Sequence, residues 1–165
     1  MAPLITLTVV TGLLMTLGRF GIRRLRGWHP ALRGGLAAMF VLTGISHFVG
    51  MREDLVAMVP PLLPAPELLV TVTGVLELAG AVGLLHRRTA GWAAAGLAGL
   101  LLAMFPANAY AALEGLTLGG EPVMALVPRA LLQLVFLAAT LGVFAPYLRE
   151  GRARRLRHAA TEVAA

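Results

Sequence analysis

The residues best suited to chemistry in this chain are polar side chains set within long apolar stretches. A carboxyl group and an imidazole can handle protons, whereas a guanidinium and side-chain amides can donate hydrogen bonds to a ligand carbonyl. Ionisable groups at such positions usually face other protein groups and are functional candidates by default. We therefore define a candidate polar cluster of five residues: His47, Glu77, Asn108, Arg129 and Gln133.

Glu77 lies in the middle of an apolar run, TVTGVLELAGAVGLL (residues 71–85). It is about ten residues, or about 15 Å, from the start of its predicted helix. A helical face of small residues lets another helix approach closely, so we expect Glu77 to point into the protein. The residues three and four positions away, which share its face, are Thr73, Gly74, Gly80 and Ala81.

The other cluster members are predicted to lie near the same end of their helices. Arg129 and Gln133 are four residues apart and share one face, and Gln133 has the expected depth closest to that of Glu77. Arg129 reaches Glu77 only if its side chain bends inward. Glu77 and Arg129 then either form a lock between helices, or Glu77 titrates; the sequence leaves both open.

The residues around the cluster have two interpretations each. Pro106 removes a backbone donor, bends its helix and leaves the carbonyl of Leu102 free, and Asn108 serves either that kink or a ligand. Phe48 and Phe105 either pack against neighbouring helices or flank a flat ligand.

The composition predicts that these residues are held in a membrane. Of the 165 residues, 58% are hydrophobic and only 13% are charged, against about 25% charged in globular proteins. The mean hydropathy is +0.82. Apolar segments near the length needed for a span, about 20 residues, predict an all-α polytopic transmembrane bundle. We expect a single transmembrane domain over residues 1–150 and a basic cytoplasmic tail over 151–165, with spans at about 4–20, 34–50, 67–85, 91–112 and 123–148.

Arginine placement predicts the orientation. All but two of the 14 basic residues fall in the first connection, the third connection or the tail, which predicts that these parts are cytoplasmic and that the N-terminus is outside. Arg33 is assigned to the first connection on this basis, and His29, His86 and His158 are expected in solvent. The second connection is expected to hold a short interfacial helix, Arg52–Val59, before a proline-rich turn.

Several classes of function are disfavoured or excluded by composition. The net charge of +6 is attributed to membrane topology, so no nucleic-acid partner is expected. The absence of cysteine excludes thiolate metal sites and disulfides. No two histidines are expected on facing helices at similar depth, so no intrinsic metal, haem or other redox cofactor is predicted.

Five motifs in order resemble the DoxX family of small bacterial membrane proteins. They are TGISHF (43–48), MVPPLLPAP (58–66), TGVLELAGAVGLL (73–85), MFPANAYAA (104–112) and PRALLQ (128–133). The resemblance covers about residues 33–145. It implies a four-helix core, so that residues 4–20 form an extra N-terminal transmembrane helix, and it implies the bacterial cytoplasmic membrane. Named members of the family belong to quinone-linked oxidoreductase systems.

The resemblance therefore implies a membrane subunit of a quinone-linked oxidoreductase, an anchor that holds quinone or an electron-donor partner protein. In this hypothesis a quinone lies in the outer leaflet, with hydrogen bonds from His47, Asn108 or Arg129 and with Glu77 handling protons. Phe48 and Phe105 flank its ring. A non-catalytic membrane scaffold is the alternative hypothesis, and a small transporter component ranks third because no broken-helix repeat supports it.

Overall fold

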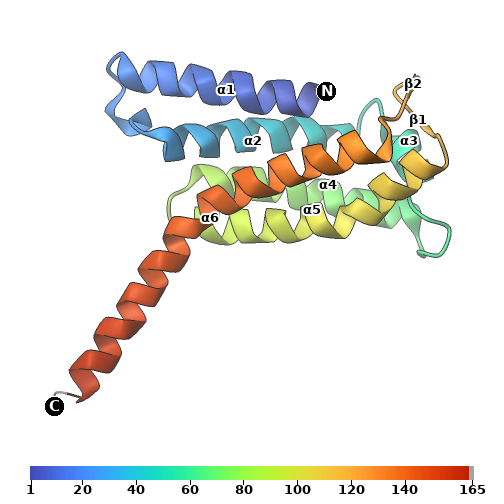
Figure 1. Ribbon diagram of the computed structural model, residues 1–165. Helices are drawn as coiled ribbons and strands as arrows, with labels where there is room; N and C mark the ends of the chain where they lie inside the picture. The colour runs from blue at the N-terminus through green and yellow to red at the C-terminus, as the bar shows by residue number, and fades with distance from the viewer. Residues whose placement is uncertain (164–165) are drawn as a thin grey trace.

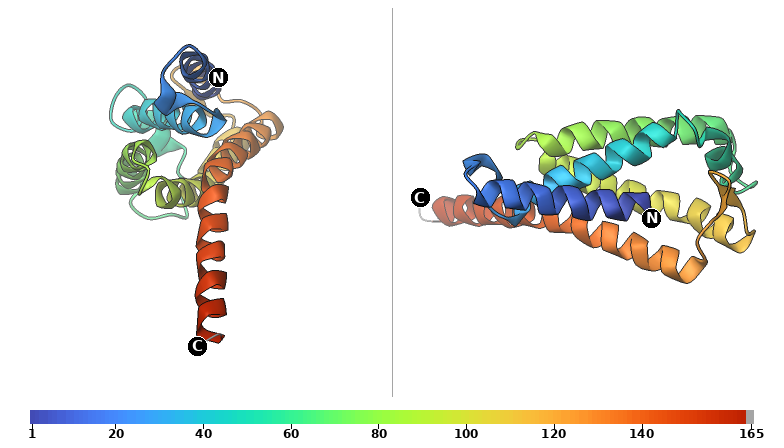
Figure 2. Two further views of the ribbon diagram at one scale, coloured as in Figure 1. Left: turned by 90° about the vertical axis from the view of Figure 1, so that its left-hand side faces the viewer. Right: turned by 90° about the horizontal axis from the view of Figure 1, so that it is seen from above.

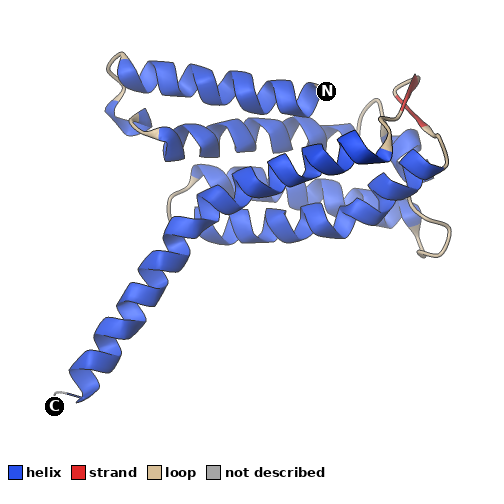
Figure 3. Cartoon of the chain, in the orientation of Figure 1, coloured by secondary structure: helices blue, strands red, loops and turns tan. Residues whose placement is uncertain are grey.

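The computed structural model describes the backbone of residues 1–163 and the side chains up to residue 149. Five long helices run back and forth beside one another, joined by short elements at both ends (Figures 1 and 3). The helices are α1 (Ala2–Arg19), η1 (Arg23–Leu25), α2 (Trp28–Ser46), α3 (Arg52–Ala57), α4 (Pro66–Leu85), α5 (Ala90–Leu113) and α6 (Leu126–Val163), and the strands are β1 (Thr117–Leu118) and β2 (Glu121–Pro122).

Four of the helices are long and apolar enough to cross a membrane: α1, α4, α5 and residues Leu126–Arg149 of α6. The fifth long helix, α2, is less apolar because its first two turns carry His29, Pro30 and Arg33. Its neighbours cover it on several sides, so α2 exposes less of its surface than the helices at the periphery. These features support the prediction of an all-α, multi-pass membrane protein.

The four helices α2, α4, α5 and α6 form a closed ring. Helix α2 packs on α4, α4 on α5, α5 on α6, and α6 returns to α2, whereas α1 lies outside the ring and packs on α2 (Figure 2). The core lies inside the ring and is aliphatic and aromatic, with Leu36 and Phe40 from α2, Leu84 from α4, Leu97 from α5 and Val143 from α6 all almost fully buried. An N-terminal helix added to a four-helix bundle is thus the observed arrangement.

Glycines bring α1 and α2 into close contact. A Cβ built on Gly34 would overlap the Leu14 side chain, and one built on Gly35 would overlap the hydroxyl of Thr11. Small residues at such positions are the usual means of helix association in a membrane, where lipid and protein interior are equally apolar. The opposite face of α1 is exposed along its length and carries Ile5, Val9 and Leu13.

The helix boundaries differ from two predicted ones. The second span was predicted at 34–50, but α2 begins at Trp28 and ends at Ser46, so His47 lies just beyond the helix. Proline is tolerated in a first helical turn, where backbone N–H groups lack partners in any case, which allows α2 to begin before Pro30. The fifth span was predicted at 123–148; α6 begins at Leu126 and continues to Val163, and its apolar part, Leu126–Arg149, ends close to the predicted position.

The short elements gather at the two ends of the bundle. The loop residues 20–27 and 86–89 lie at one end, which we call the arginine end, and the projecting part of α6 leaves from there (Figure 1). Helix α3 and the β1–β2 hairpin lie at the other, which we call the hairpin end. A short helix was predicted at Arg52–Val59, and α3 is this helix, two residues shorter. The Asp54 carboxylate accepts a 2.6 Å hydrogen bond from the Gly119 backbone N–H and so joins α3 to the hairpin.

Candidate functional site

The structure divides the predicted polar cluster into two separate pairs. His47 faces Glu77 where the end of α2 crosses α4, and this is the α2–α4 pair. Arg129 binds Asn108 between α6 and α5, and this is the α5–α6 pair. Gln133 joins neither of them, because its side chain donates to a backbone carbonyl of α5. The single cluster that the sequence predicted is therefore resolved into three contacts across two helix interfaces.

The α2–α4 pair is deeply buried. Both residues have only 4% of their surface exposed, and His47 Nε2 lies 3.9 Å from Glu77 Oε2. The other ring nitrogen, His47 Nδ1, is 2.8 Å from the carbonyl oxygen of Val70 on α4. The Thr73 hydroxyl lies 3.2 Å from the same nitrogen and donates to the carbonyl of Leu69. The imidazole is thus fixed against α4 on one side and faces the carboxyl group on the other.

The contact with Val70 fixes the tautomer of His47. A carbonyl oxygen can only accept a hydrogen bond, so Nδ1 carries the proton. In a neutral ring, Nε2 then presents a lone pair toward Glu77. Among the described residues, Glu77 Oε2 has no hydrogen-bond donor. A proton on His47 Nε2 or on Glu77 Oε2 would place a donor opposite an acceptor. The pair can therefore take up one proton between these two atoms.

Two glycines allow α2 and α4 to approach closely enough to bury the pair. A Cβ built on Gly74 would lie 2.5 Å from His47 Cβ, and one built on Gly44 would lie 3.3 Å from Glu77 Cβ. A side chain at position 74 would overlap His47, and one at position 44 would overlap Leu78 and press on Glu77. The sequence prediction that a face of small residues turns Glu77 into the protein is confirmed. Thr43, four residues before His47, lies beside the same carboxyl group.

Arg52 is a part of this site that the sequence did not predict. Its guanidinium donates to the carbonyl oxygen of His47 at 3.0 Å, and also to the Thr71 hydroxyl at 3.0 Å. It therefore ties the start of α3 to the end of α2 and to α4, and it closes the hairpin end above the pair. The available signal was its position five residues after His47, where the chain must turn.

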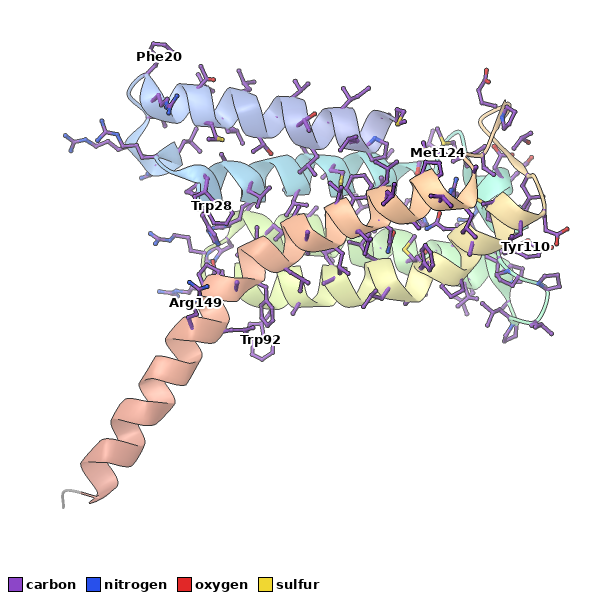
Figure 4. All side chains as sticks on the ribbon, in the orientation of Figure 1. Phe20, Trp28, Trp92, Tyr110, Met124 and Arg149 are labelled. Atoms are coloured by element: carbon purple, nitrogen blue, oxygen red, sulfur yellow. The ribbon has the colours of Figure 1, made fainter. Side chains whose placement is uncertain are left out.

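The α5–α6 pair is more open. Arg129 Nη1 donates to Asn108 Oδ1 at 2.5 Å, and Asn108 Nδ2 donates to the carbonyl of Met104 at 3.3 Å. Both side chains are half-buried. This pair lies on the part of the ring formed by α5 and α6, near the hairpin end, in the region of Tyr110 and Met124 (Figure 4). Because one guanidinium carries five N–H groups, Arg129 retains donors beyond the one that binds Asn108.

Two pairings that the sequence left open for Glu77 are not found among the described side chains. Among the described side chains, no hydrogen bond or ion pair joins Glu77 to Arg129, because Arg129 is held by Asn108 and Glu77 by the approach of His47. Gln133 does not contact Glu77 either; its amide donates to the Leu101 carbonyl at 2.5 Å. We had expected the neighbouring carbonyl, Leu102, to need a partner, since Pro106 removes its helical donor. The polar contact therefore forms one residue away from the predicted carbonyl.

The two predicted ligand-flanking rings differ in position. Phe48 lies at the end of α2, 40% exposed, with its ring against Gly74. Phe105 is on α5, beside Pro106, and is half-buried. An open apolar groove of about 500 Å³ lies between α4 and α5, and its wall includes Leu76, Gly80 and Leu100. It is lined by none of the predicted cluster or flanking residues.

Two residues assigned to the arginine-rich connection lie inside the bundle. Arg33 is only 8% exposed and its Nε donates at 2.8 Å to the carbonyl of Leu84, in the last turn of α4. His29, expected in solvent, is half-buried with Nε2 3.0 Å from the carbonyl of Val143. Both side chains bind carbonyls of other helices, so they join α2 to α4 and to α6. His86 is exposed as expected, and the side chain of His158 lies outside the described residues.

Comparison with known proteins places the chain in a family without giving its function. A family model described as "Domain of unknown function (DUF8561)" matches residues 36–153, which is most of the chain, and the protein belongs to that family. The match begins within α2 and so leaves α1 outside it. No curated protein matches the sequence. No solved structure matches it either.

Proposed function

We propose that this protein is the integral-membrane subunit of a quinone-linked oxidoreductase system and that its α2–α4 pair binds and releases one proton. The observation that supports the proton role is the contact between His47 Nδ1 and the Val70 carbonyl. It leaves Nε2 as the ring position that faces Glu77 Oε2. The resemblance of the five motifs to DoxX-like proteins suggests the quinone-linked system, and electrons come from a partner protein.

The two pairs have different roles in this proposal. A quinone supplies reversible two-electron, two-proton chemistry when it is bound. The α5–α6 pair fits its carbonyl groups better than the α2–α4 pair does, because Arg129 and Asn108 are half-buried, whereas His47 and Glu77 are closed off by the helix crossing. Arg129 and Asn108 would orient the ring, with Phe105 beside it. His47 and Glu77 would hold the proton at a distance from the ring.

We further propose that the hairpin end faces the outside of a bacterial cytoplasmic membrane and the arginine end faces the cytoplasm. The first and third connections lie at the same end of the bundle, as the arginine bias requires. Single cysteines at Glu53 and Arg88 test this in intact cells with a membrane-impermeant thiol reagent. We expect labelling at position 53 and none at position 88; the reverse pattern would invert the orientation.

Binding of a quinone analogue to the purified protein in nanodiscs tests the division of roles. We expect Arg129→Gln and Asn108→Leu to weaken binding by about tenfold, the loss of one charge-assisted hydrogen bond. Arg149→Gln, at the opposite end of the membrane-spanning part of α6, is the matched control and should bind as the wild type does. Wild-type protein that binds no analogue would refute the quinone role.

The proton role has a separate readout. Calorimetry in buffers of different ionisation enthalpy measures the protons exchanged on binding, and infrared difference spectra report protonation of a buried carboxyl group. Glu77→Gln should retain analogue binding and lose both the carboxyl band and the proton exchange. Unchanged proton exchange in Glu77→Gln would exclude this residue as the proton site, whatever the binding result.

A non-catalytic scaffold is the second candidate function. The contact of Gln133 with the Leu101 carbonyl favours it, because this side chain joins α6 to the backbone of α5, the helix that contains Pro106. In a scaffold, Glu77→Gln would lower the melting temperature and reduce any cellular redox phenotype only in proportion to the protein present. Loss of that phenotype at full expression would exclude this function.

A further inference from the structure

A third polar feature lies at the arginine end, away from both pairs. It is a cavity of about 360 Å³ between the last turn of α1 and the beginning of α2. Two guanidinium groups, one indole ring and a thioether contribute to its wall. The lining residues are Met15, Gly18, Arg19, Arg26, Gly27 and Trp28.

The backbone of the α1–α2 connection shapes this cavity. The chain folds back over the end of α1, where the Ile22 N–H donates to the carbonyl of Leu17 at 3.2 Å. Gly18 makes this possible, because a Cβ there would overlap the carbonyl group of Leu25. Arg19 and Arg26 are thereby brought to one cavity although they are seven positions apart in the sequence.

The sequence around the cavity is rich in arginine and poor in carboxylates. Arg23 and Arg24, on η1, lie between the two lining arginines in sequence, and the first 52 residues contain no aspartate or glutamate. The nearest carboxylate in sequence, Glu53, belongs to α3 at the hairpin end. Among the described side chains, no carboxylate forms an ion pair with Arg19 or Arg26. Within the part of the chain whose side chains are described, the two arginines that line the cavity therefore have no carboxylate partner.

The cavity lies where the bundle would meet a membrane surface. Trp28 is 56% exposed and Phe20 is 86% exposed, and both lie at the arginine end (Figure 4). Tryptophan is enriched at the boundary between lipid tails and headgroups, because its ring is apolar and its N–H is polar. Met15, one turn before Arg19 on α1, provides an apolar wall on the side of the lipid tails.

We propose that this cavity binds the headgroup of an anionic phospholipid. Arg19 and Arg26 bind the phosphate oxygens with charge-assisted hydrogen bonds, while Trp28 and Met15 contact the glycerol and the first part of an acyl chain. Basic pockets between helices at a membrane surface bind lipid phosphates by the same chemistry. The proposal concerns a different end of the bundle from the quinone-linked function and does not depend on it.

The test uses full-length protein in detergent and native mass spectrometry with added phosphatidylglycerol or phosphatidylcholine. We expect wild-type protein to retain phosphatidylglycerol at least tenfold better than phosphatidylcholine, and Arg19→Gln/Arg26→Gln to lose that preference. The matched control is Arg87→Gln/Arg88→Gln, which removes the same charge from the same end without touching the cavity. It should retain the preference.

Three results would overturn the proposal. Equal losses in both double variants would mean that charge at the arginine end attracts lipid without a site. Equal retention of both lipids by the wild type would mean that the phosphate charge is not recognised. Binding of inorganic phosphate that displaces phosphatidylglycerol at similar concentration would assign the cavity to a free anion. As a second variant, Gly18→Ala keeps every arginine but displaces Leu25, and it should weaken retention of phosphatidylglycerol by several-fold.

Discussion

The two polar pairs of this bundle show two ways of keeping charged groups between membrane helices. At the α2–α4 contact, Gly44 and Gly74 let the helices come together, and the packing buries His47 and Glu77 between them. At the α5–α6 contact, a long guanidinium reaches across to an amide, and both remain half-buried. The first arrangement depends on backbone approach and is rigid. The second depends on side-chain length and retains donors for another group.

The first prediction breaks the closer of the two contacts. Gly74→Val should destabilise the bundle by about 3 kcal/mol, because its side chain would overlap His47 and force α2 away from α4. Unfolding in mixed micelles measures the free energy. Gly99→Val is the control, because a Cβ built on Gly99 meets no described atom within 4 Å. Equal stability of the two variants would mean that α2 and α4 are not held at this distance.

The second prediction separates the two members of the α2–α4 pair. His47→Leu should cost about 2–3 kcal/mol, since the hydrogen bond to the Val70 carbonyl is lost and an apolar side chain replaces the imidazole that faces the buried Glu77 carboxyl group. Glu77→Gln should cost about 1 kcal/mol or less, because its amide can donate to His47 Nε2. The same unfolding measurement distinguishes them. A larger loss for Glu77→Gln than for His47→Leu would contradict the assigned tautomer.

The third prediction concerns the open pair. A double-mutant cycle with Arg129→Met and Asn108→Leu should give a coupling energy of about 0.6–1.5 kcal/mol, the range for hydrogen bonds between membrane helices. Because the pair is half-buried, this coupling should be smaller than the cost of His47→Leu. A coupling near zero would show that Arg129 binds elsewhere in the membrane.

The smallest effect is expected at the proline kink. Gln133→Leu should cost about 0.5 kcal/mol through loss of its bond to the Leu101 carbonyl, which also belongs to the α5 backbone ladder. Thermal melting of this variant beside Leu131→Ala, an exposed position on the same helix, provides the comparison. A loss above about 2 kcal/mol would make Gln133 a principal contact between α5 and α6.

Local sequence patterns predicted most of the fold. The spans 67–85 and 91–112 agree with α4 and α5 to within one residue at each end, because Pro66 and the charged turn at 86–88 limit the apolar run between them. The residues Thr73, Gly74, Gly80 and Ala81 correctly predicted that Glu77 faces protein. The predicted start of α2 was too late by six residues. Arg33 was assigned to an exposed loop because of its charge, and the sequence alone does not show that its side chain is buried.

The sequence by itself determined that the chain forms a multi-pass helical bundle and that a carboxylate is buried within it, since apolar length and small-residue spacing are local properties. Only the tertiary structure decided which groups meet. Glu77 faces His47 rather than Arg129 or Gln133 because the crossing of α2 and α4 depends on Gly44 and Gly74, which lie on different helices. A pairing across helices depends on the rotation and offset of both, and neither is contained in either segment alone.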